Sequence, residues 1–159
     1  MTDNKELQRD IEKLLDLYRS QQYKKLVLMA KQLESRWVDS ALAHEIIAAS
    51  YVQLGISDSA INHYVKSISI LPNNPKSYNN LGVVQLEIGL IDEAVKCFSS
   101  ALKLDPKYAS AYFNRGNSHR QKKNFEEAIK DYQEALRLTP LDVDTLNNLG
   151  AIYQEKGQL

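Results

Sequence analysis

The sequence lacks the features that are typical of secreted and membrane proteins. It has one cysteine, Cys97, in 159 residues, which excludes an internal disulfide framework and fits a reducing compartment. No positively charged start is followed by an apolar run, and no stretch approaches the length that spans a bilayer. The 20 basic and 20 acidic residues balance, so no global attraction to nucleic acid or anionic lipid is expected. These absences favour a cytoplasmic protein without a membrane or nucleic-acid partner.

Residues that could carry catalysis or hold a cofactor are also scarce. His44, His63 and His119 are expected on different helices, without a second ligand at metal-binding spacing on the same face. Cys97 is expected to be a packed thiol beside Phe98. No glycine-rich loop that could cradle a phosphate occurs. We therefore expect no enzymatic activity, no metal and no cofactor.

Glycine and proline are few, at 6 and 4 residues, but most of them recur at an interval of 34 residues. Alanines follow the same interval, each with an aromatic residue four positions later and a small residue three positions beyond that. A fixed period of this size indicates a stacked array of copies of one unit. The recurring residues are Gly82, Gly116 and Gly150; Ala60, Ala94 and Ala128; Tyr64, Phe98 and Tyr132; Ser67, Ala101 and Ala135; and Pro72, Pro106 and Pro140.

Each repeat is predicted to consist of two helices. In the repeat over 75–108, Pro75 pre-sets a first helix that reaches about residue 88, and Gly89 ends it in the left-handed conformation. A second helix with one apolar stripe is expected over 91–104, and the recurring proline stops it. The recurring glycine and alanine are expected to be small because the two helices cross closely there.

The register of the period divides the whole chain into one array. The first repeat is a divergent cap, because Leu26 and Ala30 replace its small and aromatic residues, although Tyr23 still matches the opening of a second helix. The expected repeats are 7–40, 41–74, 75–108, 109–142 and the half repeat 143–159.

The last repeat contains one helix and the start of a turn at Gly157. We interpret it as part of a longer protein cut after Leu159, and the alternative is that its helix serves as a terminal cap. In either case the helix should expose an apolar strip that favours self-association.

The recurring residues resemble the tetratricopeptide repeat, and the resemblance covers nearly the whole chain. It implies an all-α fold, a right-handed α–α superhelix of about four and a half helix-turn-helix repeats. It further implies that the first helix of each pair lines a concave groove, which binds other proteins and has no catalysis of its own. The pattern is Tyr78-x-x-Leu81-Gly82 … Ala94-x-x-x-Phe98-x-x-Ala101 … Pro106, with a second copy at Gly116, Ala128, Tyr132, Ala135 and Pro140.

Positions two, five, nine and twelve of each first helix fall on one stripe, which is expected to face the groove. The stripe passes from apolar near the amino end to polar near the carboxyl end, so a matching ligand is amphipathic along its length. The stripe residues are Leu42, Glu45, Ala49 and Val52; Lys76, Asn79, Val83 and Leu86; Ser110, Phe113, Asn117 and Arg120; and Asp144, Asn147, Ala151 and Gln154.

A column of asparagines, Asn80, Asn114 and Asn148, runs beside the stripe. A primary amide offers both a donor and an acceptor, which matches the backbone of an extended peptide. The column resembles the asparagine ladder in the repeat region of O-linked N-acetylglucosamine transferases, although Ile46 breaks it in the preceding repeat. The alternative is that asparagine before Leu-Gly is merely common in this repeat family.

The family also contains clamps that hold the terminal carboxylate of a chaperone tail. The nearest groups here are Lys76, Asn117 and Arg120, but the matching clamp positions carry other residues, so a carboxylate clamp is not expected. Those positions carry Asn79, Phe113 and Asn114.

The strongest basic cluster lies between Arg115 and Lys123 and is not repeated in neighbouring repeats, as a nucleic-acid surface would require. Arg115 replaces an apolar residue of the other repeats, and in the same repeat Asp131 replaces Cys97. We therefore predict an Arg115–Asp131 pair, which leaves Arg120 to hold an acidic group of a ligand.

The sequence therefore predicts a scaffold that binds an extended peptide or protein segment in its groove. The asparagine column would contact the backbone, Phe113 and Leu86 would contact side chains, and Arg120 would contact an acid. One alternative is the substrate-recruiting arm of a larger enzyme of the glycosyltransferase or sulfotransferase type, and another is a self-assembling structural protein.

Overall fold

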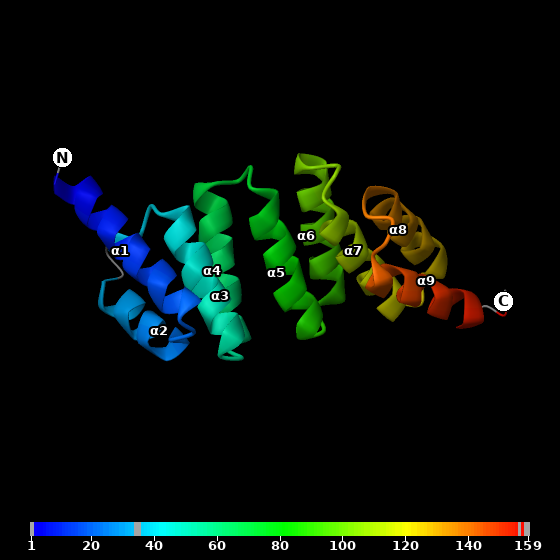
Figure 1. The fold of residues 1–159 in the computed structure, drawn as a ribbon, viewed down its shortest axis with the longest axis horizontal. Coiled ribbons are helices and arrows are strands. Elements are labelled where there is room, and N and C mark those ends of the chain that lie inside the picture. Colours follow the sequence, from blue (N-terminus) through cyan, green and yellow to red (C-terminus); the bar gives the residue numbers. More distant parts are fainter. Residues whose placement is uncertain (1, 34–35, 156, 158–159) are drawn as a thin grey trace. The chain divides into compact units, whose positions relative to one another are not determined.

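The computed structural model of the chain describes residues 2–33, 36–155 and 157. Helices α1 to α9, joined by short connections, make up its regular secondary structure (Figure 1). Contacts divide the chain into two compact units, Met1–Asn73 and Asn74–Leu159, which we call the N-terminal and C-terminal units. The boundary lies next to Pro75, where the period predicts that a new repeat begins.

The N-terminal unit is built on the pairing of α3 and α4, and α1 and α2 both pack against α3. Leu14 and Leu26 lie in its core and are fully buried. Trp37 is 1% exposed, and its Nε1 donates a hydrogen bond to the carbonyl oxygen of Ala30 at 3.1 Å. This bond holds the segment before α3 against the end of α2. The helices are α1 (Thr2–Arg19), α2 (Tyr23–Gln32), α3 (Ala41–Gln53) and α4 (Ser57–Ile70).

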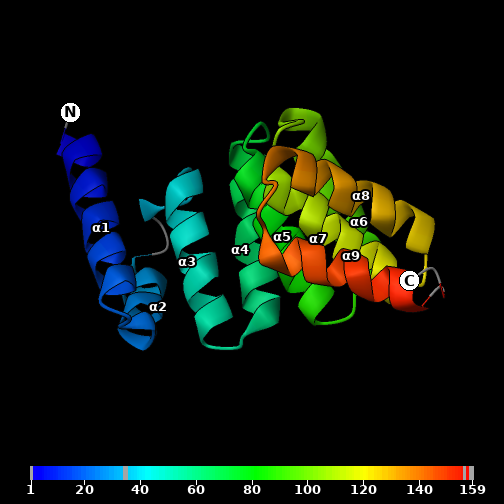
Figure 2. The ribbon, with the colours of Figure 1, turned by 45° about the vertical axis from the view of Figure 1, so that its right-hand side comes forward.

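The C-terminal unit consists of two helix pairs and a further helix (Figures 1 and 2). α5 pairs with α6 and α7 pairs with α8, while α7 also packs on α6 and α9 packs on α8. The first helices α7 and α9 are thereby in contact with the second helix of the repeat before them. The helices are α5 (Pro75–Glu87), α6 (Ile91–Leu104), α7 (Ala109–Gln121), α8 (Phe125–Leu138) and α9 (Val143–Glu155).

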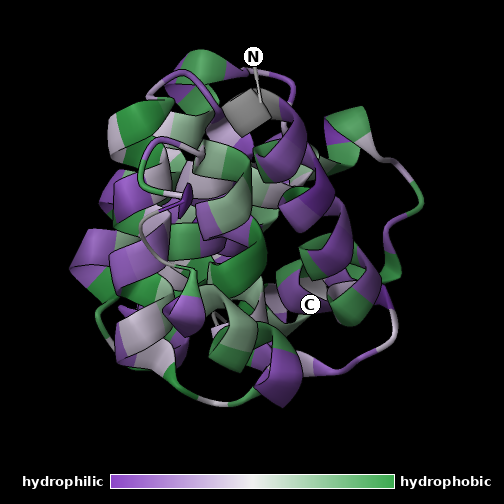
Figure 3. Ribbon diagram, turned by 90° about the vertical axis from the view of Figure 1, so that its left-hand side faces the viewer, coloured by the Kyte–Doolittle hydropathy of each residue, from purple (hydrophilic) through white to green (hydrophobic). Residues whose placement is uncertain are grey.

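The second helices of the C-terminal unit are strongly amphipathic. In α6 the buried residues Ala94, Phe98 and Ala101 follow one another at spacings of four and three, which places them on one face. Acidic residues occupy the first turn of α6 and a lysine the last, as the helix dipole favours. Figure 3 shows that the helices carry both hydrophobic and hydrophilic residues.

The recurring glycine lies where the two helices of a repeat cross. A Cβ built on Gly82 would lie 2.7 Å from Cε1 of Phe98, and one on Gly116 would lie 2.7 Å from Cε1 of Tyr132. Any larger residue would collide with the aromatic ring of the second helix. The prediction that these positions are small because the helices cross closely is confirmed, and the contacting residue is the recurring aromatic.

The turn after the first helix of each repeat has one residue in the left-handed conformation. Successive residues of this set are 34 positions apart, and two of them are not glycine. One of these two lies in the divergent first repeat, so the backbone of that repeat follows the same period. They are Gln21 (φ 57°), Gly55 (φ 70°), Gly89 (φ 83°), Lys123 (φ 59°) and Gly157 (φ 65°).

The helix boundaries agree with those predicted from the period. The second helix expected over 91–104 is α6, with the same bounds, and the first helix expected to reach about residue 88 ends at Glu87. Tyr23 begins α2, as predicted for the divergent repeat. The all-α fold class is confirmed. In the described part of the chain, no helix combines the length and apolar character needed to cross a membrane.

Replacing Lys123 with glycine is expected to raise the free energy of unfolding by about 1 kcal/mol, because a Cβ is unfavourable at a φ of 59°. Urea denaturation followed by circular dichroism measures the change. Gly89→Ala is the matched variant and should lower the stability, since its φ is 83°. A Lys123→Gly protein no more stable than the parent would contradict the expectation.

Candidate functional site

The first helices of the C-terminal unit, α5, α7 and α9, carry the candidate ligand-binding face. A hollow of about 490 Å³ opens on this face, and we call it the Arg120 hollow. It brings together Leu86 of α5 with Asn117 and Arg120 of α7, all of which belong to the predicted stripe. Its other lining residues are Gln121, Lys123 and Glu155.

Asparagine side chains link consecutive first helices. Asn114 Nδ2 donates to Asn79 Oδ1 at 3.0 Å, which joins α7 to α5. Asn148 Nδ2 donates to Asn117 Oδ1 at 2.9 Å, which joins α9 to α7. The Tyr132 hydroxyl also donates to Asn117 Oδ1, at 2.7 Å. These bonds orient the amides of Asn114 and Asn148 before any ligand arrives.

These bonds use only part of the hydrogen-bonding capacity of the predicted asparagine column. A primary amide has two N–H donors and two acceptor sites, and Asn114 and Asn148 each donate once to the neighbouring helix. Asn80 is half-buried and has no side-chain hydrogen bond to the described residues. Asn79 differs, because it is 6% exposed and lies beneath the face, where it positions Asn114.

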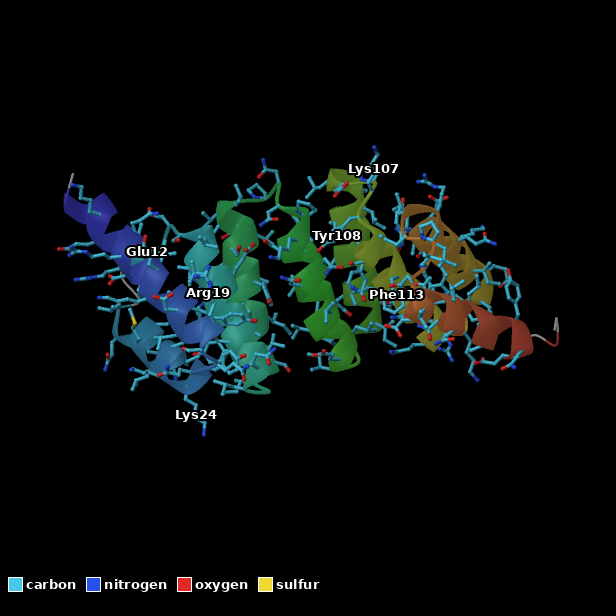
Figure 4. The ribbon with its side chains drawn as sticks, viewed as in Figure 1. Glu12, Arg19, Lys24, Lys107, Tyr108 and Phe113 are labelled. Carbon is cyan, nitrogen blue, oxygen red and sulfur yellow. The ribbon has the colours of Figure 1, made fainter. Side chains whose placement is uncertain are left out.

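Phe113 of α7 is labelled in Figure 4. It lines a second hollow, of about 120 Å³. One side of its ring packs against the cluster of Ala128, Tyr132 and Ile152, and its ring centroid lies 6.1 Å from that of Tyr132. The Phe113 ring therefore belongs partly to the core and partly to the candidate ligand-binding face. The second hollow is also lined by Ala109, Ser110, Ala135, Thr139, Asp142, Asp144 and Thr145.

Two further predicted contacts, Lys76 and Asn147, are exposed and line neither hollow. Their contact with a ligand stays a prediction.

Arg120 lines the Arg120 hollow together with two other charged residues, Lys123 and Glu155. Its Nη1 donates to Asn148 Oδ1 at 3.1 Å, and its Nη2 lies 3.5 Å from Glu155 Oε1. The side chain of Arg120 is 34% exposed and that of Glu155 is 49% exposed. A pair this exposed contributes less than about 1 kcal/mol, so an acid from a ligand can replace Glu155 at little cost.

Comparison with protein-family models identifies the repeats. A TPR repeat model matches residues 48–89, 87–121 and 116–157, which together span more than half of the chain. The chain belongs to the tetratricopeptide repeat (TPR) family. Curated protein sequences contain no match to it.

Solved structures with a similar fold agree with the family. The structure of MamA 41-end from Desulfovibrio magneticus RS-1 has a TM-score of 0.88 at 18% identity, covering 96% of this chain and 86% of that one. The first TPR of Spaghetti (RPAP3) bound to the HSP90 peptide SRMEEVD has a TM-score of 0.73 at 28% identity, covering 76% and 95%. The first TPR domain of human RPAP3 has a TM-score of 0.70 at 30% identity, covering 72% and 90%.

The predicted Arg115–Asp131 pair of this TPR chain is confirmed. Arg115 Nη2 lies 2.7 Å from Asp131 Oδ1 and its Nε lies 2.8 Å from Oδ2, so the pair is bidentate. The side chains are 24% and 6% exposed. The hydrogen bonds that Arg115 donates to Asp131 raise the pKa of the Arg115 guanidinium. His119 lies 3.9 Å from the same carboxylate, but burial lowers the pKa of its imidazole, which is neutral at pH 7.

The basic cluster around these residues is largely paired within the TPR unit. Besides Arg115 with Asp131, Lys122 binds Asp92 and Arg120 faces Glu155. Three of its cations therefore lie against acids of the same chain, and Arg120 is the one of these that also lines the Arg120 hollow.

Sequence spacing did not reveal a histidine pair in the N-terminal unit. His44 of α3 and His63 of α4 lie on different helices, as expected, but their Nδ1 atoms are 2.9 Å apart. They line a pocket of about 200 Å³ with Trp37 and Tyr51, and the Tyr51 ring stacks on His63 at 5.6 Å between centroids. Spacing along one helix misses such a pair, because it forms across two helices.

The described residues contain no group of three or more His, Cys, Asp or Glu side chains placed to hold a metal. Cys97 is a free, half-buried thiol on α6. Burial, with a smaller contribution from Glu93, raises the pKa of the Cys97 thiol to about 11. The thiol is therefore protonated at neutral pH and a poor nucleophile.

The Arg115–Asp131 pair can be tested with a substitution that leaves one charge alone. Asp131→Ala should lower the free energy of unfolding by about 3 kcal/mol, because Arg115 loses its partner in a largely buried site. The double variant Arg115→Leu/Asp131→Cys restores the residues found at Leu81 and Cys97 and should recover most of that loss. Urea denaturation measures both, and a double variant as unstable as the single one would refute this account.

Cys97 should react slowly with alkylating reagents in the folded protein. Its pKa of about 11 makes the thiolate fraction at pH 8 roughly 100-fold smaller than that of a free thiol with a pKa of about 9. Iodoacetamide labelling followed by mass spectrometry gives the rate, and the protein unfolded in urea is the control. Equal rates in the folded and unfolded protein would show that burial does not protect the thiol.

Proposed function

We propose that the C-terminal unit binds an extended peptide or protein segment along the face of α5, α7 and α9, and that the chain acts as a cytoplasmic adaptor or scaffold. The observation that carries the proposal is the Arg120 hollow, which joins an apolar side chain, an amide and a guanidinium on one surface. The free cysteine agrees with a reducing compartment.

The asparagine column supplies the proposed contacts to the ligand backbone. Asn114 and Asn148 each keep one N–H and at least one acceptor site after the bonds described above, which suits one C=O and one N–H of a peptide. Packed helices lie roughly 10 Å apart, and an extended chain advances about 3.3 Å per residue. Successive asparagines of the column would therefore contact ligand residues roughly three positions apart. This arrangement resembles the asparagine ladder of O-linked N-acetylglucosamine transferases.

The two side chains flanking the column define the proposed ligand preference. Leu86 offers an apolar contact, and Arg120 offers a charge that an acidic ligand residue would take over from Glu155. Phe113 offers the exposed side of its ring. A fitting segment carries an apolar residue and an acidic residue near each other.

The TPR of Spaghetti (RPAP3) bound to the HSP90 peptide SRMEEVD supports a peptide as the class of ligand. The clamp positions of this chain carry Asn79, Phe113 and Asn114, none of which is charged, and Asn79 is 6% exposed. We therefore expect the preferred peptide to bind through its backbone and an internal acid, without requiring a terminal carboxylate.

The triple variant Asn80→Ala, Asn114→Ala, Asn148→Ala should bind peptides at least tenfold more weakly, because each lost hydrogen bond contributes about 0.5–1.5 kcal/mol. The probes are peptides selected against the whole chain from a random display library, and titration calorimetry gives the affinities. Asn73→Ala, at an exposed asparagine in the turn before α5 that lines neither hollow, is the matched control. Circular dichroism must show unchanged helicity, and unchanged affinity would refute the ladder.

A further inference from the structure

The imidazoles of His44 and His63 meet in the wall of the pocket of the N-terminal unit. Their Nδ1 atoms are 2.9 Å apart, and both residues line the pocket of about 200 Å³. His44 is 3% exposed and His63 is half-buried. The Tyr51 ring stacks on His63 with 27° between the ring planes. Packing therefore holds two nitrogen ligands close together beside an open space.

The same place in a repeat of the C-terminal unit holds a cation. Tyr112 and Asp131 occupy the positions of the two histidines, two repeat periods later. The Arg115 guanidinium bonds to Asp131 at 2.7 and 2.8 Å, and its Cζ lies 5.7 Å from the centroid of the Tyr112 ring. Ile47 has the position of Arg115 in the N-terminal unit and lines the pocket. The repeat geometry thus suits a cation between these positions, and the side chain of Ile47 does not supply one.

The separation of the two Nδ1 atoms indicates which metal ions fit between them. With metal–nitrogen bonds of about 2.0–2.1 Å, atoms 2.9 Å apart subtend an angle of roughly 90° at the ion. Neighbouring ligands lie at this angle in the square-planar and tetragonal sites of Cu²⁺ and Ni²⁺. A tetrahedral ion such as Zn²⁺ would need the nitrogens about 3.3–3.4 Å apart. The pair therefore favours ions of the first kind.

We propose that His44 and His63 bind a Ni²⁺ or Cu²⁺ ion through their Nδ1 atoms, and that water completes the coordination inside the pocket. Neutral imidazole is the binding form, so the proton shared between the two nitrogens moves to an Nε2 atom when the ion binds. Ser59 and Asn62 line the pocket and offer oxygen atoms to metal-bound water. Two protein ligands are fewer than the four of a structural zinc site, so the ion is exchangeable.

Lys31 also lines the pocket, and its positive charge opposes a metal ion there. The residue is exposed, so its long side chain can turn the amine into solvent. Removing this charge gives the proposal a test with a definite sign, because Lys31→Gln should bind Ni²⁺ about twofold more tightly than the parent. Weaker binding by Lys31→Gln would show that the lysine helps to hold the occupant and would count against a metal ion.

Isothermal titration calorimetry of the whole chain without an affinity tag measures the binding. At about pH 7.5, where free imidazole is neutral, we expect one Ni²⁺ ion per chain with a dissociation constant below about 1 mM. Ni²⁺ is the probe because Cu²⁺ can oxidise thiols, and the chain contains Cys97. Mg²⁺ prefers oxygen ligands, so it is the control ion and should show no saturable binding in the same range.

His63→Gln should weaken Ni²⁺ binding at least tenfold, because it removes one of the two nitrogen ligands. His63 is the less buried of the pair, and circular dichroism must show unchanged helicity in the variant. His119→Gln is the matched control, since it replaces the third histidine of the chain, which lies on α7 of the C-terminal unit. It should leave the affinity unchanged.

A second measurement needs no substitution at the site. Ni²⁺ is paramagnetic and broadens nearby proton signals steeply with decreasing distance, so substoichiometric Ni²⁺ should broaden the imidazole signals of His44 and His63 before that of His119. The His119→Gln spectrum assigns the third signal. Absence of saturable binding up to about 1 mM, equal affinity in His63→Gln, or earlier broadening of His119 would overturn the proposal. The contact between the two rings would then be a hydrogen bond alone.

Discussion

The contact between a glycine of one helix and an aromatic ring of the next is the constraint on which each complete repeat of the C-terminal unit depends. The rings of Phe98 and Tyr132 lie so close to Gly82 and Gly116 that no side chain fits between them. Shape complementarity of this kind sets the distance between two helices more narrowly than hydrophobicity alone does. The alanines flanking each ring serve the same purpose, because they let the helix backbones approach.

Tyr132, which makes one of these contacts, also bonds to the candidate ligand-binding face. Its ring lies on Gly116, and its hydroxyl donates to Asn117, which lines the Arg120 hollow and accepts from Asn148. Burial raises the pKa of Tyr132 to about 12, so the hydroxyl keeps its proton and remains a donor at every physiological pH. The amides of the face are thus oriented by a residue of the core. The hydrogen-bonding groups of the face are therefore oriented before a ligand binds.

Periodicity predicted much of this fold because it reports on the backbone and on burial. The bounds of α6, the left-handed Gly89 and the small residue at Gly82 all follow from the interval and the residue types. The Arg115–Asp131 pair was also predictable, since two unusual residues occur together in one repeat. These features depend on positions that every copy shares.

Features that depend on the direction of individual side chains could not be predicted in this way. The period places Asn79 on the ligand-facing stripe, yet its side chain lies under Asn114 and is 6% exposed. It likewise separates His44 from His63, although their rings meet between two helices. In both cases the deciding factor is a contact with a residue of another helix, which the spacing along one helix does not encode.

Trp37, the one tryptophan of the sequence, gives the two units different optical properties. It belongs to the N-terminal unit, where it is 1% exposed and donates to the carbonyl oxygen of Ala30. Its fluorescence emission should therefore shift when that unit unfolds and report nothing directly about the C-terminal unit, whose chromophores are tyrosine and phenylalanine. The chain thus carries a built-in spectroscopic label, which separates the melting of one unit from that of the whole.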